Sequence, residues 1–237
     1  MLWHRGSALS EQRTADTLAQ AAIAMVTSGM VVGLGAGKTA ARGIVALAER
    51  VNEGELDIRC VAASQHAEDY ARSLGLRMID FSSLEEIDLL IDGADEVDRD
   101  MCVMKGSRGA MTRERILCWA SKQTIFMVTA DKVAEVQIGT ASPLPVAVME
   151  FGLSSTREAL RHIGVSGVLR SDHNGGHFHT DNNNIVLDAT LRGDEDLAEL
   201  ASELNDIPGV IDHGLFIDEA DVILIEHAND EIERLER

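Results

Sequence analysis

A lysine and three carboxylates with spacing suited to acid–base chemistry lie near one another in the middle of the chain. Asp92 and Asp95 stand three residues apart, directly after an apolar run, and Lys105 follows between methionine and glycine. Glu114 falls in the first turn of an expected helix. Taken singly, a turn aspartate or a glutamate near a helix N-terminus is commonly structural. Together, the four residues converge on one region and predict an acid–base site.

A glycine-rich turn, VGLGAGKT at 32–39, is a second candidate element. A nucleotide-binding P-loop places a glycine five residues before its Gly-Lys-Thr glycine, and Val32 occupies that position here. A dinucleotide fingerprint is matched in part by Gly35, Gly37 and Ala40. The acidic residues available to that fingerprint, at 53 and 55, precede the next expected strand instead of ending it. Both nucleotide interpretations are therefore alternatives only.

Both nucleotide interpretations require the turn at 32–39 to bind an anion. Backbone N–H groups at a helix N-terminus attract anions, and the Lys38 charge and the Thr39 hydroxyl would add to them. Gly35 and Gly37 would let the backbone approach the ligand closely. The turn predicts a site for a phosphate on a small substrate.

Alternating strands and helices must position both candidate elements. We expect helices at 11–28, 40–51, after 65 and at 111–122, and strands at 30–34, 58–63, 78–79, 87–91 and 124–129. The pattern predicts an α/β fold with a Rossmann-like, mostly parallel sheet covered by helices on both faces. Ligands of such sheets bind at the carboxyl ends of the strands, where both elements fall.

The chain changes character near residue 139, ahead of Pro143 and Pro145. We expect a Rossmann-like catalytic domain made of 1–138 and 208–237, and a smaller α+β domain at 139–207. The smaller domain should hold strands at 146–151 and 185–189, helices at 156–163 and 194–204, and a hairpin that joins 167–171 to 177–181. Strands at 210–216 and 222–225 should return to the main sheet, and 226–237 reads as a charged helix end.

Composition narrows the classes of partner. The 237 residues carry 21 Lys and Arg against 40 Asp and Glu, a formal charge of −19. Such a surface repels nucleic acid and anionic membranes, so neither is an expected partner. Three cysteines without paired spacing fit a reducing compartment. Without an apolar signal-peptide segment or a long apolar span, a cytoplasmic location is expected.

Nearly the whole chain resembles the ribose-5-phosphate isomerases of type A. The order of motifs is similar to that family, and the acidic segment DGADEVD followed by Lys105 and Glu114 is its most specific part. Further matches are the turn at 32–39, Ala130-Asp131, Pro143 to Val146, Thr180 to Asn182 with Asp188, and Ile207 to Val210 with His213 to Phe216.

The resemblance implies interconversion of ribose 5-phosphate and ribulose 5-phosphate through an enediolate, with neither metal nor other cofactor. Glu114 would be the base, Lys105 would stabilise the oxyanion, and Asp95, oriented by Asp92, would open the sugar ring. A homodimer or homotetramer is expected, since the family commonly self-associates.

Departures from the family pattern lie where phosphate and hydroxyl groups would be held. Ala36 and Lys38 replace a threonine and a serine, and Ser107 and Arg108 interrupt a stretch of glycines after Lys105-Gly106. The Asp-x-Ser-Lys motif is shortened to Asp131-Lys132. Gly106, Ser107, Arg108 and Lys132 are thus candidate substrate-binding residues, and a different sugar phosphate remains an alternative substrate.

Two other hypotheses remain open. The same fold without catalysis would be a sugar-phosphate sensor, which would normally carry an effector domain. His173, His177 and His179 are close enough in sequence to suggest zinc, although they lack a fixed ligand spacing and also suit a polar hairpin.

Overall fold

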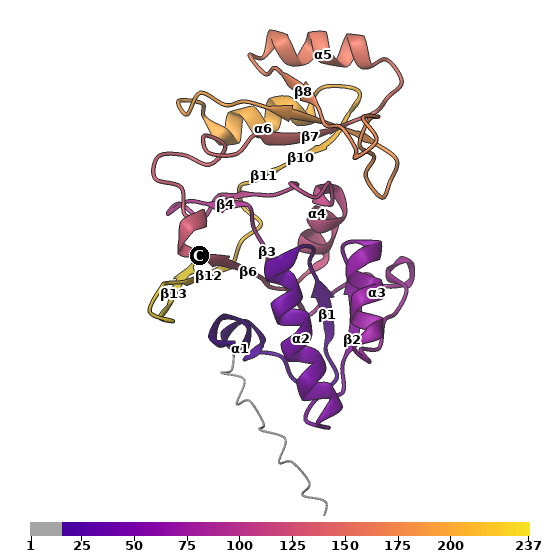
Figure 1. Ribbon diagram of the computed structural model, residues 1–237, viewed down its shortest axis with the longest axis vertical. Coiled ribbons are helices and arrows are strands. Elements are labelled where there is room, and N and C mark those ends of the chain that lie inside the picture. Colours follow the sequence, from indigo (N-terminus) through magenta and orange to yellow (C-terminus); the bar gives the residue numbers. More distant parts are fainter. Residues whose placement is uncertain (1–15) are drawn as a thin grey trace, which may run out of the picture.

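The structure of the protein is a computed structural model that describes residues 16–237. Two sheets dominate it, one in the lower and one in the upper part of Figure 1, with a small three-stranded sheet and helix α4 between them. The helices are α1 (Thr17–Ile23), α2 (Lys38–Asn52), α3 (Gln65–Ser73), α4 (Met111–Ala120), α5 (Leu153–His162) and α6 (Leu197–Asn205), with short 3-10 turns at Phe81–Ser83 and Ala130–Lys132.

The larger sheet has the strand order β13-β12-β6-β3-β1-β2. Its strands β2, β1, β3, β6 and β12 are mutually parallel, and β13 is antiparallel to β12. Their bounds are β1 (Val31–Leu34), β2 (Arg59–Ala62), β3 (Leu89–Gly93), β6 (Thr124–Thr129), β12 (Val222–Glu226) and β13 (Ile232–Glu236). Strands β1 and β3 are buried along their whole length, as expected of a sheet covered on both sides.

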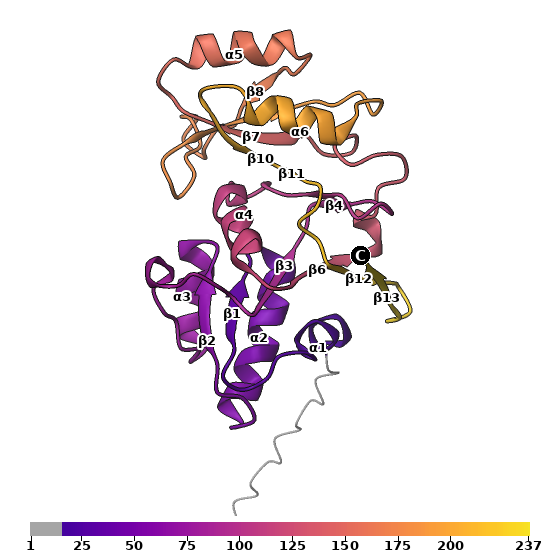
Figure 2. The same ribbon diagram turned by 180° about the vertical axis from the view of Figure 1, so that it is seen from behind.

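Helices cover both faces of this sheet, which confirms the expected α/β class. Buried residues of α1, α2 and α3 form one core cluster with alternate residues of the strands, including Leu34, Ile91 and Met127. The intervening strand residues, such as Leu90 and Phe126, form a second cluster with α4 on the opposite face. Figures 1 and 2 show α2 and α4 on either side of β1 and β3.

A second, antiparallel sheet has the order β10-β7-β9-β8. Its strands are β7 (Leu144–Val148), β8 (Gly167–Leu169), β9 (Ile185–Ala189) and β10 (Val210–His213). Buried residues of α5 and α6 pack with this sheet into a third core cluster. The small sheet β11-β5-β4, made of Leu215–Phe216, Val103–Met104 and Glu96–Val97, connects the two regions.

Several expectations about individual segments are wrong. The segment 210–216 does not return to the main sheet, because β10 pairs with β7 and β11 pairs with β5. The C-terminal segment contains the strand β13 where a helix end was expected; it completes the edge of the main sheet beside β12. Strand β8 pairs with β9, and only a single bridge, Ser171 to His177, remains of the expected hairpin.

Other segments are shorter than expected. Met78 makes one isolated bridge to Cys60 instead of forming a strand. The first helix begins at Thr17 behind the capping residue Asp16, and the part expected at 11–15 lies outside the described residues. The division into domains at 139 and 207 stays a prediction. Among residues 16–237, no helix combines the length and apolar character that crossing a bilayer requires.

Candidate active site

A cavity of about 220 Å³ opens at the carboxyl ends of β1 and β3. Ten of the twelve predicted site residues line it, together with Ala36, Gly93 and Ala94; the ten are Gly37, Lys38, Thr39, Asp95, Lys105, Gly106, Ser107, Arg108, Glu114 and Lys132. The other two, Gly35 and Asp92, lie in contact behind this lining. The structure therefore brings the predicted acid–base residues and the predicted phosphate-binding turn to one place.

The centre of the site is a buried cluster of one lysine and two carboxylates. Asp92, Lys105 and Glu114 are 0%, 3% and 4% exposed, respectively. Lys105 Nζ lies 2.8 Å from Asp92 Oδ2 and 3.4 Å from Glu114 Oε1, and it donates to the Gly93 carbonyl oxygen at 2.5 Å. Glu114 Oε2 has no hydrogen-bond partner among the described residues. One carboxylate oxygen at the cavity wall is thus left unpaired.

Burial sets the proton affinity of this cluster. Removal from water raises the pKa of Glu114 to about 8; Lys105 opposes the rise, and the negative charges of Asp92 and Asp95 add to it. Burial also raises the pKa of Asp92, although Lys105 and two backbone N–H donors counteract this. For Lys105, burial would lower the pKa, but the two carboxylates outweigh burial and raise it. The lysine is a permanent cation, and Glu114 is the group poised to exchange a proton.

Backbone groups of two strand ends fix Asp92. Its Oδ1 accepts hydrogen bonds from Gly93 N at 2.7 Å and from Ala36 N at 3.1 Å, so the carboxylate joins the end of β3 to the glycine turn after β1. Gly35 makes this approach possible, since a Cβ there would lie 1.8 Å from Asp92 Oδ1. Asp92 is therefore a structural anchor for Lys105 as well as a charge.

Replacing Gly35 by alanine is expected to displace Asp92 and lower both stability and turnover. The Cβ cannot share space with a carboxylate that is fixed by its backbone donors, and overpacking of this kind costs about 1–3 kcal/mol. Gly176→Ala is the matched control, because its Cβ would be 3.5 Å from the nearest atom, an ordinary contact. Thermal melting and kcat for both variants check this; a Gly35→Ala enzyme with unchanged kcat would contradict it.

Asp95 is held by the loop that follows Lys105. Ser107 donates to it twice, from its backbone N at 2.9 Å and from its hydroxyl. Asp95 is half-buried and Ser107 is exposed, so this pair faces the open side of the cavity. The arrangement separates two positions: Glu114 is buried at the wall of the cavity, whereas the half-buried Asp95 can reach a polar group of a bound molecule.

Cations line the remainder of the cavity. Lys38 and Thr39 begin α2, whose first backbone N–H groups lack partners within the helix and make its N-terminus attractive to anions. Arg108 packs beside Gly37, which has a φ of 98° that favours glycine. Lys132 donates to the Ala94 carbonyl oxygen, and burial lowers its pKa. The cavity thus combines a helix N-terminus with three cationic side chains in its lining.

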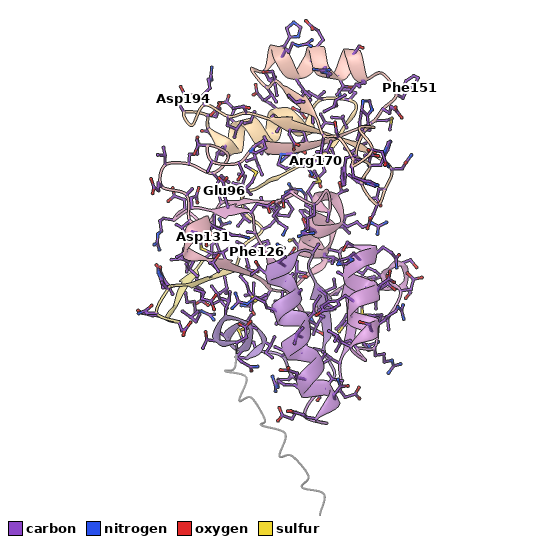
Figure 3. All side chains as sticks on the ribbon, in the orientation of Figure 1. Glu96, Phe126, Asp131, Phe151, Arg170 and Asp194 are labelled. Atoms are coloured by element: carbon purple, nitrogen blue, oxygen red, sulfur yellow. The ribbon has the colours of Figure 1, made fainter. Side chains whose placement is uncertain are left out.

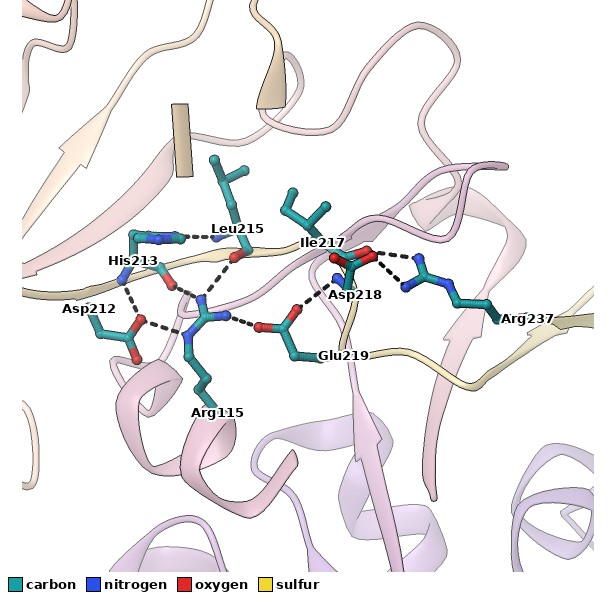
Figure 4. Close-up of polar contacts among 8 residues, drawn as sticks. All are labelled: Arg115, Asp212, His213, Leu215, Ile217, Asp218, Glu219 and Arg237. Atoms are coloured by element: carbon teal, nitrogen blue, oxygen red, sulfur yellow. Dashed lines mark hydrogen bonds and ion pairs between the residues drawn. The ribbon is translucent and has the colours of Figure 1, made fainter. Parts of the chain in front are cut away.

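Arg115 orients the helix that carries Glu114. Its guanidinium donates to Asp212 Oδ1, to the carbonyl oxygens of His213 and Leu215 at 2.8 Å each, and to Glu219 (Figure 4). Burial lowers the pKa of His213 to about 3, so its ring is neutral in this network. These contacts tie α4 to β10 and β11. Sequence reasoning missed Arg115, because its partners lie 97 to 104 residues away.

The histidine segment gives no support to a zinc site. His177 and His179 form bridges to Ser171 and Ile185, respectively. Within residues 16–237, no group of three or more His, Cys, Asp or Glu side chains is arranged to hold a metal ion.

Comparison with known proteins places the chain in one family. Residues 59–230 match the family described as ribose 5-phosphate isomerase A (phosphoriboisomerase A). A ribose-5-phosphate isomerase A of Gluconobacter oxydans is 42% identical over 211 residues, which are 88% of this chain and 90% of the relative. One of Desulfatibacillum aliphaticivorans is 38% identical over 89% of this chain and 92% of the relative.

Solved structures agree. A D-ribose-5-phosphate isomerase in complex with phospho-erythronic acid superimposes with a TM-score of 0.89 at 32% identity, covering 94% of this chain and 97% of the other. The ribose 5-phosphate isomerase A of Methanocaldococcus jannaschii gives 0.87 at 30% identity, covering 93% and 97%. Sequence and structure thus agree over almost the full length of both chains, and the chain belongs to the ribose 5-phosphate isomerase A family.

Proposed function

We propose that this protein interconverts ribose 5-phosphate and ribulose 5-phosphate, with Glu114 as the base that moves a proton between C2 and C1. The observation that carries the proposal is the buried cluster of Asp92, Lys105 and Glu114, in which Glu114 Oε2 is unpaired at the wall of a small cavity. Family membership supplies the substrate class, and the cavity supplies the acid–base groups.

Proton transfer in the aldose-to-ketose direction begins with ionised Glu114. Its carboxylate takes the proton from C2, the C2–H electron pair forms the C1–C2 double bond, and the C1 carbonyl oxygen gains the negative charge. Glu114 then returns a proton to C1, and the O2 hydroxyl proton passes to O1, which leaves the ketone at C2. One carboxylate near both carbons is sufficient for these transfers.

Lys105 would stabilise the enediolate as the charge moves. In the free protein its ammonium group contacts Gly93 O, Asp92 and Glu114, and the contact with Glu114 is the longest of the three. When Glu114 becomes a neutral acid, its attraction for Lys105 weakens while the substrate oxygen becomes negative. An N–H of Lys105 can then turn to that oxygen in a dry site, where such a hydrogen bond is strongest.

The phosphate would lie at the start of α2. Lys38, the Thr39 hydroxyl and Arg108 surround this end of the cavity, and they offset the acidity of a chain with a charge of −19. Asp95 at the opening would exchange a proton with the ring oxygen or the O1 hydroxyl of the cyclic sugar. Ser107, which donates to both Asp95 oxygens, would hold that carboxylate in place.

A panel of pentose and tetrose phosphates assayed for aldose–ketose conversion tests this function. Ribose 5-phosphate should be turned over, and phospho-erythronic acid should compete with it, because its planar carboxylate has the two-oxygen shape of an enediolate. Conversion of another sugar phosphate in place of ribose 5-phosphate would show that Lys38 and Arg108 define a different pocket. Binding of sugar phosphates without any conversion would overturn the enzymatic proposal in favour of a sensor.

Asp95→Asn is expected to separate ring opening from proton transfer. Turnover of ribose 5-phosphate should fall by about 10²-fold, the usual contribution of one acid–base group. Ribulose 5-phosphate has no furanose ring to open, so exchange of its C1 protons with D₂O should stay within a few-fold of wild type. Proton NMR follows both reactions. If exchange falls as far as isomerisation does, Asp95 has another role.

We also propose a cytoplasmic enzyme that self-associates as a homodimer or homotetramer, with no nucleic-acid or membrane partner. The acidic charge and the family membership support this proposal. Analytical ultracentrifugation tests the assembly, and a monomer at micromolar concentration would contradict it.

A further inference from the structure

Arg170, just beyond β8 in the upper region, reaches down to the loop that lines the active site. Its Nη1 donates to the carbonyl oxygens of Gly106 and Ser107, both at 2.9 Å. Figure 3 labels Arg170 at the lower border of the upper sheet region. Both acceptors belong to residues that line the cavity, so a side chain of the second sheet region contacts the wall of the site from behind.

The guanidinium of Arg170 is itself held in place. Its Nε donates to Asp188 Oδ2 at 2.9 Å and its Nη2 donates to Asp188 Oδ1, which makes a two-point ion pair with β9. Its charge also lies 5.5 Å from the centre of the Phe178 ring. The Arg170 and Asp188 side chains are only 16% and 24% exposed, so water screens the pair little.

The loop at 105–109 contains two glycines in the left-handed region of backbone conformation. Gly106 and Gly109 have φ values of 102° and 77°, and glycine is the residue that keeps the most freedom there. The Phe178 ring packs against Gly109, where a Cβ would lie 2.5 Å from the nearest ring atom. Contacts from the second sheet region therefore hold this loop at the Gly106 and Ser107 carbonyl groups and at Gly109.

We infer that Arg170 and Asp188 are a positioning pair, which fixes the 105–109 loop so that Ser107 holds Asp95 and Arg108 faces the substrate. This inference rests on the proposed isomerase function for its kinetic consequences. Neither residue lines the cavity itself, and both act through the loop. Only arginine has a planar fork that can bind a carboxylate along one edge and two carbonyl groups from another.

Substitution of the pair is expected to impair the site without altering the base. Arg170→Gln should lower kcat/KM for ribose 5-phosphate by about 10–100-fold, because small misplacements of binding groups have effects of this size. Arg170→Lys should recover only part of the loss, since it keeps the charge but not the fork. Asp188→Asn should have the smaller effect, and the double variant should be no worse than Arg170→Gln alone. The pH at which kcat/KM rises, set by Glu114, should not move.

Hydrogen exchange measures the loop independently of turnover. In Arg170→Gln, amides at 105–109 should exchange at least several-fold faster than in wild type, including Gly109 N, which is bonded to Gly106 O. Peptides from α5 should be unchanged. Arg161→Gln, an exposed arginine on α5, is the matched control and should behave as wild type in both measurements.

The outcomes separate the two proposals. Wild-type kcat/KM and wild-type loop exchange in Arg170→Gln would overturn the positioning role. Faster exchange throughout the protein, with activity lost in proportion to unfolding, would also overturn it and assign Arg170 to general stability. If wild-type protein fails to convert ribose 5-phosphate, the proposed function fails, whereas loop exchange still decides the inference.

Discussion

Glu114→Gln will lower kcat for ribose 5-phosphate by about 10³-fold or more, while the folded protein becomes more stable at alkaline pH. The loss of turnover follows because the amide cannot accept the C2 proton. The gain in stability follows because a carboxylate 4% exposed, with one oxygen unpaired, is costly to ionise. A glutamine of the same shape removes that cost and still accepts from Lys105.

The pH dependence of stability has a definite sign. The pKa of Glu114 is about 8 in the folded protein against an ordinary value of 4.5, so between these values the folded state holds a proton that the unfolded state has released. This contribution is fully present below about 4.5 and is lost as the pH rises through about 8, at about 1.4 kcal/mol for each pKa unit. The Tm advantage of Glu114→Gln should therefore grow across this range and level off above it.

Catalysis should depend on pH in the opposite direction. Only ionised Glu114 is a base, so kcat/KM of the wild-type enzyme should rise with pH up to about 8. Glu150→Gln, an exposed glutamate outside the cavity, is the control and should change neither kcat nor the pH dependence of Tm. A Glu114→Gln enzyme that keeps more than about a tenth of wild-type kcat would exclude Glu114 as the base.

Lys105→Met will have the second large effect, and it combines loss of turnover with loss of stability. Asp92 and Glu114 would remain buried without their shared cation, and an uncompensated buried charge typically costs about 3–5 kcal/mol. The enediolate would also lose its donor, which is worth about 10²–10³-fold in kcat. Chemical unfolding and steady-state kinetics measure the two effects separately.

A double variant keeps this prediction testable if Lys105→Met folds poorly. Adding Asp92→Asn removes one of the two buried negative charges that Lys105→Met leaves without a cation. The amide oxygen of the asparagine can still accept from Gly93 N and Ala36 N. The double variant should regain much of the lost stability and none of the lost turnover. Recovery of turnover together with stability would show that Lys105 serves the fold and not the reaction.

Sequence reasoning selected residues that the structure brings to one cavity, because they follow strand ends and turns that have local signals. The apolar run that ends in Asp92 predicted one strand, and the run that leads into the glycine turn at 32–39 predicted another. Parallel strands bring their carboxyl ends to the same edge of a sheet. Lys105 and Glu114 were then expected near the same edge of the sheet, Lys105 in a loop and Glu114 at the start of a helix. The buried cluster itself, with its distances and its raised pKa, depends on packing that no local pattern encodes.

The misassigned segments depend on partners distant in sequence. A charged tail such as 226–237 has the composition of a solvated helix, but β12 offers it an open edge and it forms β13. The four residues of β10 carry no signal for which sheet they join, and only their pairing with β7 assigns the strand to the second sheet. Arg115 and Arg170 were missed for the same reason, because their acceptors include backbone carbonyl groups from segments distant in the sequence.

Deuterium incorporation at C1 of ribulose 5-phosphate tests most directly whether Glu114 moves the proton. Wild-type enzyme in D₂O should exchange one C1 proton at a rate comparable with turnover, because the proton on Glu114 equilibrates with solvent while the enediolate is bound. Glu114→Gln should leave C1 unlabelled over the same period, although phospho-erythronic acid still binds. Exchange at an undiminished rate in Glu114→Gln would contradict proton transfer by Glu114.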